Sequence, residues 1–234
     1  MQGSPEQISF TIEVRRTRKD HPWSYSLLDD RQREIASQLA NDPLSSGGLL
    51  LSEVEPVITL GRRTPPEDLN LPRNHLEQLG VSVLRVDRGG LATYHGPGQW
   101  VLFPVDRLER LTGDRRGVRK AVYGLLEVAR RVVCRLAPLE LVEVREGAEL
   151  GVWTQSGKKL AAVGVHVSQG VLLHGLAINF RRTATSFVGL RPCGLDAPVG
   201  FIEELDSCVS RDFDAAGALI IEEVRKVFWS GAGH

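Results

Sequence analysis

The sequence predicts an α+β fold in one domain, with mixed β-sheets flanked by helices. Stretches of apolar residues typical of strands lie between stretches whose apolar residues recur three or four apart, as in helices. The chain of 234 residues is 42% hydrophobic and 25% charged, which is enough apolar material for one large core. No internal repeat or Gly/Ser linker divides the sequence.

The first half of the chain contains candidate strands and short helices in turn. Residues 1–24 alternate charged and apolar side chains and form either a short strand or a loose extension. Residues 29–40 carry an apolar face with Ile35 and Leu39 and predict a helix. Residues 48–63 predict a buried strand interrupted at Pro56. A short helix over 73–80 ends at Gly80, and residues 81–90 predict a strand that leads into a loop.

The second half gives clearer signals. Residues 114–137 place apolar side chains three or four apart behind Asp114, a candidate N-cap, and predict a long helix. Residues 158–180 form two apolar runs separated by Ser168, Gln169 and Gly170, the pattern of a β-hairpin. Residues 213–229 predict a last helix.

Charge and cysteine content exclude several classes of protein. Lys plus Arg and Asp plus Glu number 29 each, so no overall field favours nucleic acid or an anionic membrane. No segment has the length of a membrane helix or the pattern of a signal peptide, so we expect a cytoplasmic protein. The three cysteines, Cys134, Cys193 and Cys208, are widely spaced, and neither a disulfide framework nor a metal site is expected.

Residues 88–100, RGGLATYHGPGQW, form the first stretch that the fold alone does not explain. Four glycines and a proline surround Arg88, Tyr94, His95 and Gln99. Glycines at this density allow a loop to close around a ligand. The alternative is a tight loop in which Tyr94 and His95 only satisfy local hydrogen bonds, and both interpretations stay open. The dinucleotide fingerprint G-x-G-x-x-G is absent.

Residues 156–164, SGKKLAAVG, contain two adjacent lysines. A phosphate loop is rejected, because Val152 and Lys159 stand where that motif requires Gly and Ser or Thr. On a strand, Lys159 would share its face with Ala161, Val163 and Val165. Partial desolvation there would lower the pKa of its amine from about 10.4. The alternative, which the spacing by itself favours, places Lys158 and Lys159 at a solvated strand end.

Cys193 lies between Pro192 and Gly194 in the stretch LRPCGLDAPV. Proline fixes φ and glycine permits positive φ, so a turn here would expose the thiol. A thiol ionises near pH 8.5, and a neighbouring cation favours the thiolate. A reactive role is therefore favoured for Cys193, whereas Cys134 and Cys208 are expected to be structural.

Taken in chain order, RGGLATYHGPGQ, KLAAVGVHV, HGLAINF, RPCGL and GFIEEL resemble the lipoate-protein octanoyltransferases. The match runs from about Leu49 to Leu205. One departure lies upstream, where Glu53-Val54-Glu55-Pro56 replaces the usual Glu-His-Pro-Pro. The resemblance implies the α+β fold of the biotin- and lipoate-protein ligases, with residues 25–234 as the catalytic domain and 1–24 as an N-terminal extension.

The resemblance also implies roles for particular residues. Cys193 corresponds to the nucleophile that forms an acyl thioester, and Lys159, not Lys158, corresponds to the lysine that lowers the thiol pKa and moves protons. For His174 and Asn179 the sequence leaves open whether they orient the substrate or only satisfy the core, and support of the site is the preferred interpretation. The implied acyl and substrate pocket is lined by Arg88, Gly89, Gly90, Leu91, Ala92, Thr93, Tyr94, His95, Ala162, Val163, Gly164, Gly175, Leu176 and Ala177.

The implied reaction transfers octanoyl from octanoyl-acyl carrier protein to one lysine of a lipoyl carrier domain. The acceptors would be lipoyl domains of 2-oxoacid dehydrogenase complexes and the glycine cleavage H protein. No cofactor is required, since the acyl group arrives on the phosphopantetheine of the carrier. We expect a monomer, and the basic cluster Arg115, Arg116, Arg119 and Lys120 is either a docking patch for the acidic carrier or a solvated face.

Two rival functions remain at this point. An ATP-dependent lipoate- or biotin-protein ligase would need no cysteine nucleophile, and the HGPGQ and RPCGL stretches disfavour it. A non-enzymatic binding domain of the same fold would leave Cys193 chemically ordinary. A cysteine protease is disfavoured because no local protease signature accompanies Cys193.

Overall fold

The computed structural model describes residues 10–65, 68–190 and 198–229. Within this part of the chain, strands form two sheets, one of seven strands and one of three. In spatial order the strands of the large sheet are β1 (Phe10–Arg16), β2 (Gly47–Glu53), β6 (Gln99–Arg107), β10 (Val171–Asn179), β9 (Lys159–Ser168), β8 (Gly151–Thr154) and β7 (Val142–Arg145). Only the β1–β2 pair is parallel, so the sheet is mixed.

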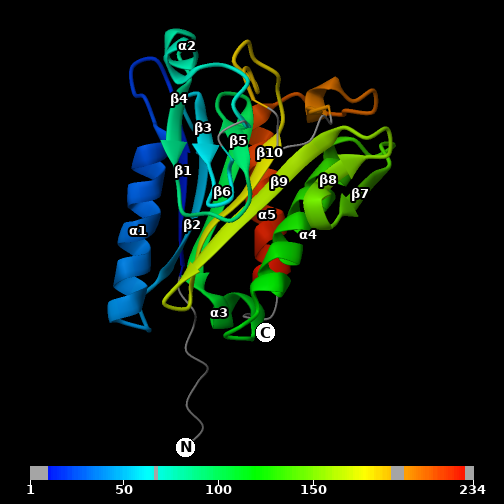
Figure 1. Cartoon of the computed structure of the whole chain (residues 1–234). Coiled ribbons are helices and arrows are strands. Elements are labelled where there is room, and N and C mark those ends of the chain that lie inside the picture. Colours follow the sequence, from blue (N-terminus) through cyan, green and yellow to red (C-terminus); the bar gives the residue numbers. More distant parts are fainter. Residues whose placement is uncertain (1–9, 66–67, 191–197, 230–234) are drawn as a thin grey trace, which may run out of the picture.

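In Figure 1 the small sheet lies beside the β1 and β2 side of the large sheet. Its strands, in spatial order, are β4 (Ser82–Arg85), β3 (Val57–Leu60) and β5 (Ala92–His95). The helices are α1 (Tyr25–Asn41), α2 (Arg73–Gln78), α3 (Leu108–Thr112), α4 (Val118–Leu136) and α5 (Phe213–Phe228), and two 3-10 turns span Gly147–Glu149 and Ile202–Glu204.

Helices cover both faces of the large sheet (Figure 1). On one face α1 packs Leu28, Ile35 and Leu39 against β2 and β6 in a core that also contains Val57 of the small sheet. On the other face the apolar side of α4 and residues of α5 pack against β6, β9 and β10. The two apolar faces of the sheet therefore belong to two cores, as expected for an α+β fold.

Several predicted elements are confirmed. The hairpin over 158–180 is β9 and β10, and its turn places Gln169 and Gly170 at φ 48° and 78°, the positive values that a tight hairpin turn requires. The short helix predicted before Gly80 is α2, which ends at Gln78 and is closed by Gly80 at the C′ position: Gly80 has φ 75°, and Val81 N–H donates to Leu76 O at 2.9 Å. The long helix over 114–137 is α4.

The N-terminal segment contributes to the large sheet. Residues 10–16, which we assigned to an N-terminal extension, form β1 and pair with β2 along their whole length. Of the two forms expected for residues 1–24, the described part adopts the strand. The domain boundary at residue 24 stays a prediction.

Two helix starts differ from the sequence-based expectation. α1 begins at Tyr25, four residues before the predicted start, because the Ser24 hydroxyl accepts a hydrogen bond from Leu27 N at 3.3 Å and caps the helix. Asp114 does not cap α4. Its carboxylate accepts from Arg116 N at 2.9 Å in the preceding turn, and the N-cap residue is Gly117.

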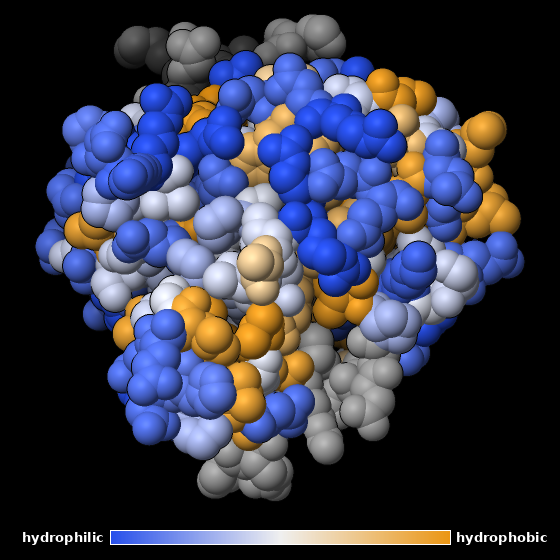
Figure 2. All heavy atoms as spheres, turned by 90° about the horizontal axis from the view of Figure 1, so that it is seen from above, coloured by the Kyte–Doolittle hydropathy of each residue, from blue (hydrophilic) through white to orange (hydrophobic). Residues whose placement is uncertain are grey.

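The molecular surface is mostly hydrophilic in the view of Figure 2, with a band of weakly polar and apolar residues across its middle. In the described part of the chain no helix combines the length and the apolar character needed to cross a membrane.

Gly217 provides a test of the packing between α5 and the sheet. A Cβ at this position would lie 2.7 Å from Cζ2 of Trp100. Trp100 cannot move away easily, because its ring stacks on Phe213 and its Nε1 donates to Phe213 O at 3.0 Å. We predict that Gly217→Ala lowers the free energy of unfolding by about 1–3 kcal/mol in urea titrations.

Helix propensity alone predicts the opposite sign for Gly217→Ala, a gain of about 1 kcal/mol. The exposed Ala218 on the same helix gives the matched control, since Ala218→Gly should cost only that propensity term. A stabilised Gly217→Ala protein would contradict the packing described here.

Candidate active site

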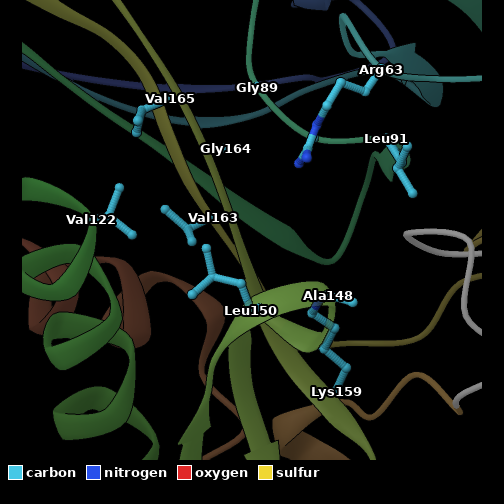
Figure 3. Close-up of a pocket in the computed structure, with 12 residues that line it drawn as sticks. Arg63, Gly89, Leu91, Val122, Ala148, Leu150, Lys159, Val163, Gly164 and Val165 are labelled. Atoms are coloured by element: carbon cyan, nitrogen blue, oxygen red, sulfur yellow. The ribbon is translucent and has the colours of Figure 1, made fainter. Parts of the chain in front are cut away.

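A cleft between loop 88–91, the small sheet and strand β9 is lined by Lys159 and by most of the predicted binding residues. Its largest part, here called the outer pocket, has a volume of about 510 Å³. Figure 3 shows Arg63 reaching into this pocket from one side, with Val122, Leu150 and Val163 gathered on the other. The outer pocket is lined by Arg63, Gly89, Gly90, Leu91, Val122, Gly147, Ala148, Leu150, Lys159, Val163, Gly164 and Val165.

A second, deeper part is here called the histidine pocket and has a volume of about 50 Å³. It shares Gly90, Leu91, Val163 and Gly164 with the outer pocket. The histidine pocket is lined by Tyr25, Arg88, Gly90, Leu91, Thr93, His95, Phe103, Ala162, Val163, Gly164, His174, Gly175, Leu176 and Ala177.

The third part, here called the lysine pocket, connects the other two. It shares Thr93 and Ala162 with the histidine pocket and Lys159 with the outer pocket. The lysine pocket is lined by Thr93, Gln99, Lys159, Ala162, Asn179, Phe187 and Val199. Lys159 therefore lies where the outer and lysine pockets meet.

Lys159 is buried, with 6% of its surface exposed. Its Nζ lies 5.2 Å from the centroid of the Trp153 ring, a favourable position for a cation. Its backbone N–H donates to Pro198 O at 3.0 Å, and Gly200 N–H donates to Lys159 O at 2.9 Å. This burial contradicts the solvated strand end that spacing alone favoured, whereas Lys158 is exposed.

Arg88 stabilises loop 88–91, which forms one wall of the cleft. Its guanidinium is buried and donates to Thr59 O at 2.7 Å and to Leu91 O at 2.8 Å. The loop then contacts β9 directly, because Gly89 N–H donates to Val165 O at 3.0 Å. Arg88 therefore holds loop 88–91 in shape and ties it to β3 by charge-assisted hydrogen bonds, while the backbone of Gly89 makes the contact with β9.

His95 belongs to a buried hydrogen-bond chain that ends at Lys159. His95 Nδ1 contacts Gln99 Oε1 at 2.8 Å, and Gln99 Nε2 donates to Asn179 Oδ1 at 2.8 Å. Asn179 Nδ2 donates to Lys159 O at 3.3 Å. Burial, together with the charge of Arg88, lowers the pKa of His95 to about 3, so its ring is neutral.

His174 has a left-handed backbone within a strand, with φ 59°. The β6–β10 ladder is interrupted at this point, between Leu172 and Leu176. His174 N–H instead donates to Gln32 Oε1 of α1 at 2.7 Å, and its Nδ1 lies 3.2 Å from Tyr25 OH and from Gln32 Nε2. Burial lowers the pKa of His174 to about 4, so this ring is neutral as well.

The structure brings most of the predicted binding residues together. All of those from Ala162 to Gly164 and from Gly175 to Ala177, as well as Arg88, Gly90, Leu91, Thr93 and His95, line the histidine pocket, and Gly89 lines the outer pocket. Ala92 and Tyr94 line none of the three pockets. They lie in the core of the small sheet, because side chains of β5 alternate between its two faces. Cys193 lies outside the described residues.

Sequence reasoning missed the contribution of α1. Tyr25 and Gln32 lie two helical turns apart on its buried face and both contact His174. The signal was a glutamine on the apolar face of a helix, since a buried amide requires hydrogen-bond partners. Arg63, Val122 and Leu150 of the outer pocket carried no recognisable motif.

The basic cluster, for which the sequence left open a docking patch or a solvated face, is exposed just before and along the start of α4. Arg115 pairs with Glu109 at 2.8 Å, and Arg119 lies over the Tyr123 ring at 5.3 Å. One turn further along α4, Val122 lines the outer pocket. Carrier docking at this cluster stays a prediction.

The two buried histidines predict acid sensitivity. Each folded-state pKa lies below the unfolded value of about 6.5, so between pH 6.5 and about 4 the unfolded chain binds more protons than the folded one. The free energy of unfolding should therefore fall as the pH falls, by about 1.4 kcal/mol per pH unit for each histidine. Urea titrations at pH 7, 6, 5 and 4 measure this slope. In the His174→Asn variant about half of this slope should be lost. If the difference in free energy of unfolding between this variant and the wild type does not vary with pH, the lowered pKa of His174 is contradicted.

Comparisons with known proteins agree on one family. Residues 29–224 match the family model of the lipoyl protein ligase A/B catalytic domain. The chain is 34% identical to the octanoyltransferase of Desulfotalea psychrophila over 191 residues, which cover 80% of this chain and 79% of that protein. It is 37% identical to the octanoyltransferase of Chloroflexus aurantiacus over 174 residues, 74% and 75% of the two chains. For that of Magnetococcus marinus the identity is 40% over 164 residues, 70% and 71%.

Solved structures share the fold at low sequence identity. Lipoate-protein ligase A bound with ATP superposes with a TM-score of 0.65 at 13% identity, over 94% of this chain and 85% of that chain. An archaeal bipartite lipoate protein ligase from Thermoplasma acidophilum gives 0.55 at 15% identity, over 95% and 84%. These neighbours confirm the predicted α+β fold of the lipoate-protein ligase type, and the relatives, being octanoyltransferases, confirm the predicted acyltransferase class. The chain belongs to the lipoyl protein ligase A/B catalytic domain family.

Proposed function

We propose that this protein transfers an octanoyl group from octanoyl-acyl carrier protein to a lysine of lipoyl carrier domains, through a thioester on Cys193. The observation that carries the proposal is a lysine buried where the pockets of the cleft meet, in a chain whose relatives are octanoyltransferases. Lys159 is the proposed base, and the cleft is the proposed acyl site.

The first described residues after Cys193 in the sequence lie beside Lys159. The described chain stops at Leu190, which is buried and bridges to Leu69, and it resumes at Pro198. Pro198 O accepts a hydrogen bond from Lys159 N–H, and Val199 pairs with Lys159 as an isolated bridge. Cys193 is only five residues from Pro198 in the sequence, which supports its assignment to the same site.

In the first half of the proposed reaction, the Lys159 amine takes the proton of the Cys193 thiol. The thiolate attacks the carbonyl carbon of the octanoyl thioester, and the bond between that carbon and the phosphopantetheine sulfur breaks. The leaving thiolate takes the proton back from Lys159. The octanoyl group is then a thioester of Cys193, and the deacylated carrier departs.

In the second half, a neutral lysine amine of the lipoyl domain attacks the Cys193 thioester. Its surplus proton passes to Lys159 and then to the departing Cys193 sulfur, which regenerates the thiol. A thioester is exchanged for an amide, a downhill step, so the proposed reaction requires no cofactor. A lipoyl domain as acceptor is supported by the Thermoplasma ligase, which was determined with its E2 lipoyl domain.

An ATP-dependent ligase is the alternative within this fold. Its support is limited to fold neighbours at 13% to 15% identity, whereas relatives at 34% to 40% identity are octanoyltransferases. The transferase is therefore the stronger hypothesis.

Substitution of the two lysines at the start of β9 tests the proposal. We predict that Lys159→Met lowers the single-turnover rate of octanoyl transfer to a lipoyl domain by about 10²- to 10⁴-fold, the usual contribution of a general base. Cys193→Ser should abolish transfer. The rate is measured by mass spectrometry of the acceptor domain, with octanoyl-acyl carrier protein as donor and without ATP.

Two variants serve as matched controls. Lys158→Met changes the exposed neighbour of Lys159, and Cys208→Ser changes a half-buried thiol whose Sγ donates to Ser210 O. Both should transfer within about twofold of wild type. Equal losses in Lys158→Met and Lys159→Met, or a wild type that is active only with ATP, would refute the proposal.

A further inference from the structure

Two ring nitrogens that belong to residues lining the histidine pocket have no hydrogen-bond partner among the described residues. They are Nε2 of His95 and Nε2 of His174, and both residues are at least nine-tenths buried, with exposures of 5% and 1%. A buried polar atom without a partner costs free energy. The proposed function gives neither nitrogen a role.

The hydrogen bonds on the opposite side of each ring determine which nitrogen carries the proton. Gln99 Nε2 donates to two carbonyls, Tyr94 O and Asn179 Oδ1, so Gln99 Oε1 is the acceptor that faces His95. The proton of the neutral His95 ring therefore lies on Nδ1. His95 Nε2 is an unprotonated acceptor.

His174 has the opposite tautomer. Gln32 Oε1 accepts from His174 N–H, so Gln32 Nε2 donates to His174 Nδ1. Tyr25 OH, 3.2 Å from the same atom, donates to it as well. The proton of the neutral His174 ring therefore lies on Nε2, which is a donor.

The two rings belong to one cluster. The Tyr25 ring stacks on His95 with centroids 5.2 Å apart, and its hydroxyl contacts His174. The two tautomers are complementary to one water molecule, which would accept from His174 Nε2–H and donate to His95 Nε2. The pocket volume of about 50 Å³ holds a few water molecules. Water at this position and the end of a long acyl chain would compete for the same space.

The distance from the junction of the lysine and histidine pockets to this cluster is comparable to the length of an octanoyl chain. Lys159 does not line the histidine pocket, which joins the lysine pocket at Thr93 and Ala162. Ala162 pairs with Ala177, and His174 lies three residues before Ala177 in β10, about 10 Å away at the usual strand rise. An extended eight-carbon acyl chain measures about 9 Å from its carbonyl carbon to its last carbon, given C–C bonds of about 1.5 Å.

We propose that His95 and His174 hold one water molecule at the closed end of the histidine pocket, and that this polar stop selects acyl chains of about eight carbons. The inference rests on the proposed function, in which the cleft holds the acyl chain. A longer chain must displace the water and leave one donor and one acceptor unpaired, whereas a chain of eight carbons ends before them.

Binding of unreactive acids separates this inference from the transfer chemistry. Calorimetry with octanoate, decanoate and dodecanoate should show that wild-type affinity falls beyond eight carbons, although burial of two more methylenes alone would raise it about tenfold. His174→Asn, which keeps a residue tolerant of positive φ, should reverse the order, so that decanoate binds about tenfold tighter than octanoate. His166→Asn, on β9 but outside all three pockets, should keep the wild-type order.

Identical chain-length orders in wild type and His174→Asn would overturn the polar stop, and so would a wild type that binds none of the acids. If the polar stop behaves as expected but no octanoyl transfer occurs, only the proposed function fails. Nitrogen-15 NMR of the wild-type histidines at pH 7 tests the tautomers without any substitution. It should report protons on His95 Nδ1 and His174 Nε2, and the same tautomer in both rings would contradict the inference.

Discussion

The close approach of two backbones, loop 88–91 and strand β9, determines the shape of the site. Gly89 N–H donates to Val165 O at 3.0 Å, and a Cβ on Gly164 would lie only 3.0 Å from Gly89 O. Arg88 holds the loop in this position through carbonyls of Thr59 and Leu91. The cleft beside this contact is lined largely by glycines and apolar side chains, as an acyl chain requires.

A missing hydrogen bond in the sheet gives the cleft its polar end. The β6–β10 ladder is interrupted between Leu172 and Leu176, and His174 N–H donates to Gln32 Oε1 of α1 instead. This arrangement places an imidazole, rather than an aliphatic side chain, inside the pocket. Desolvation and the buried charge of Arg88 lower the pKa of both histidines, so each ring presents one fixed donor or acceptor. The cleft thus combines largely apolar walls with two oriented polar atoms, the Nε2 atoms of His95 and His174.

Local sequence patterns predicted the elements whose determinants are local. The β9–β10 hairpin and α4 followed from apolar periodicity, and the loop that contacts β9 followed from its glycines. Lys159 did not follow from spacing, because its burial depends on Trp153 and on residues 198–200. The positive φ of His174 and the roles of Tyr25 and Gln32 depend on contacts between segments more than 140 residues apart, which periodicity does not report.

The central claim of this account is that the cleft carries an acyl group on Cys193 between two partners. Intact-protein mass spectrometry of the protein mixed with octanoyl-acyl carrier protein alone tests it most directly. The account predicts an octanoyl adduct on the wild type that maps to Cys193, is labile to hydroxylamine, and disappears when a lipoyl domain gains the same mass. A wild type that transfers octanoyl without any such adduct, or an adduct that persists unchanged in Cys193→Ser, would contradict the claim.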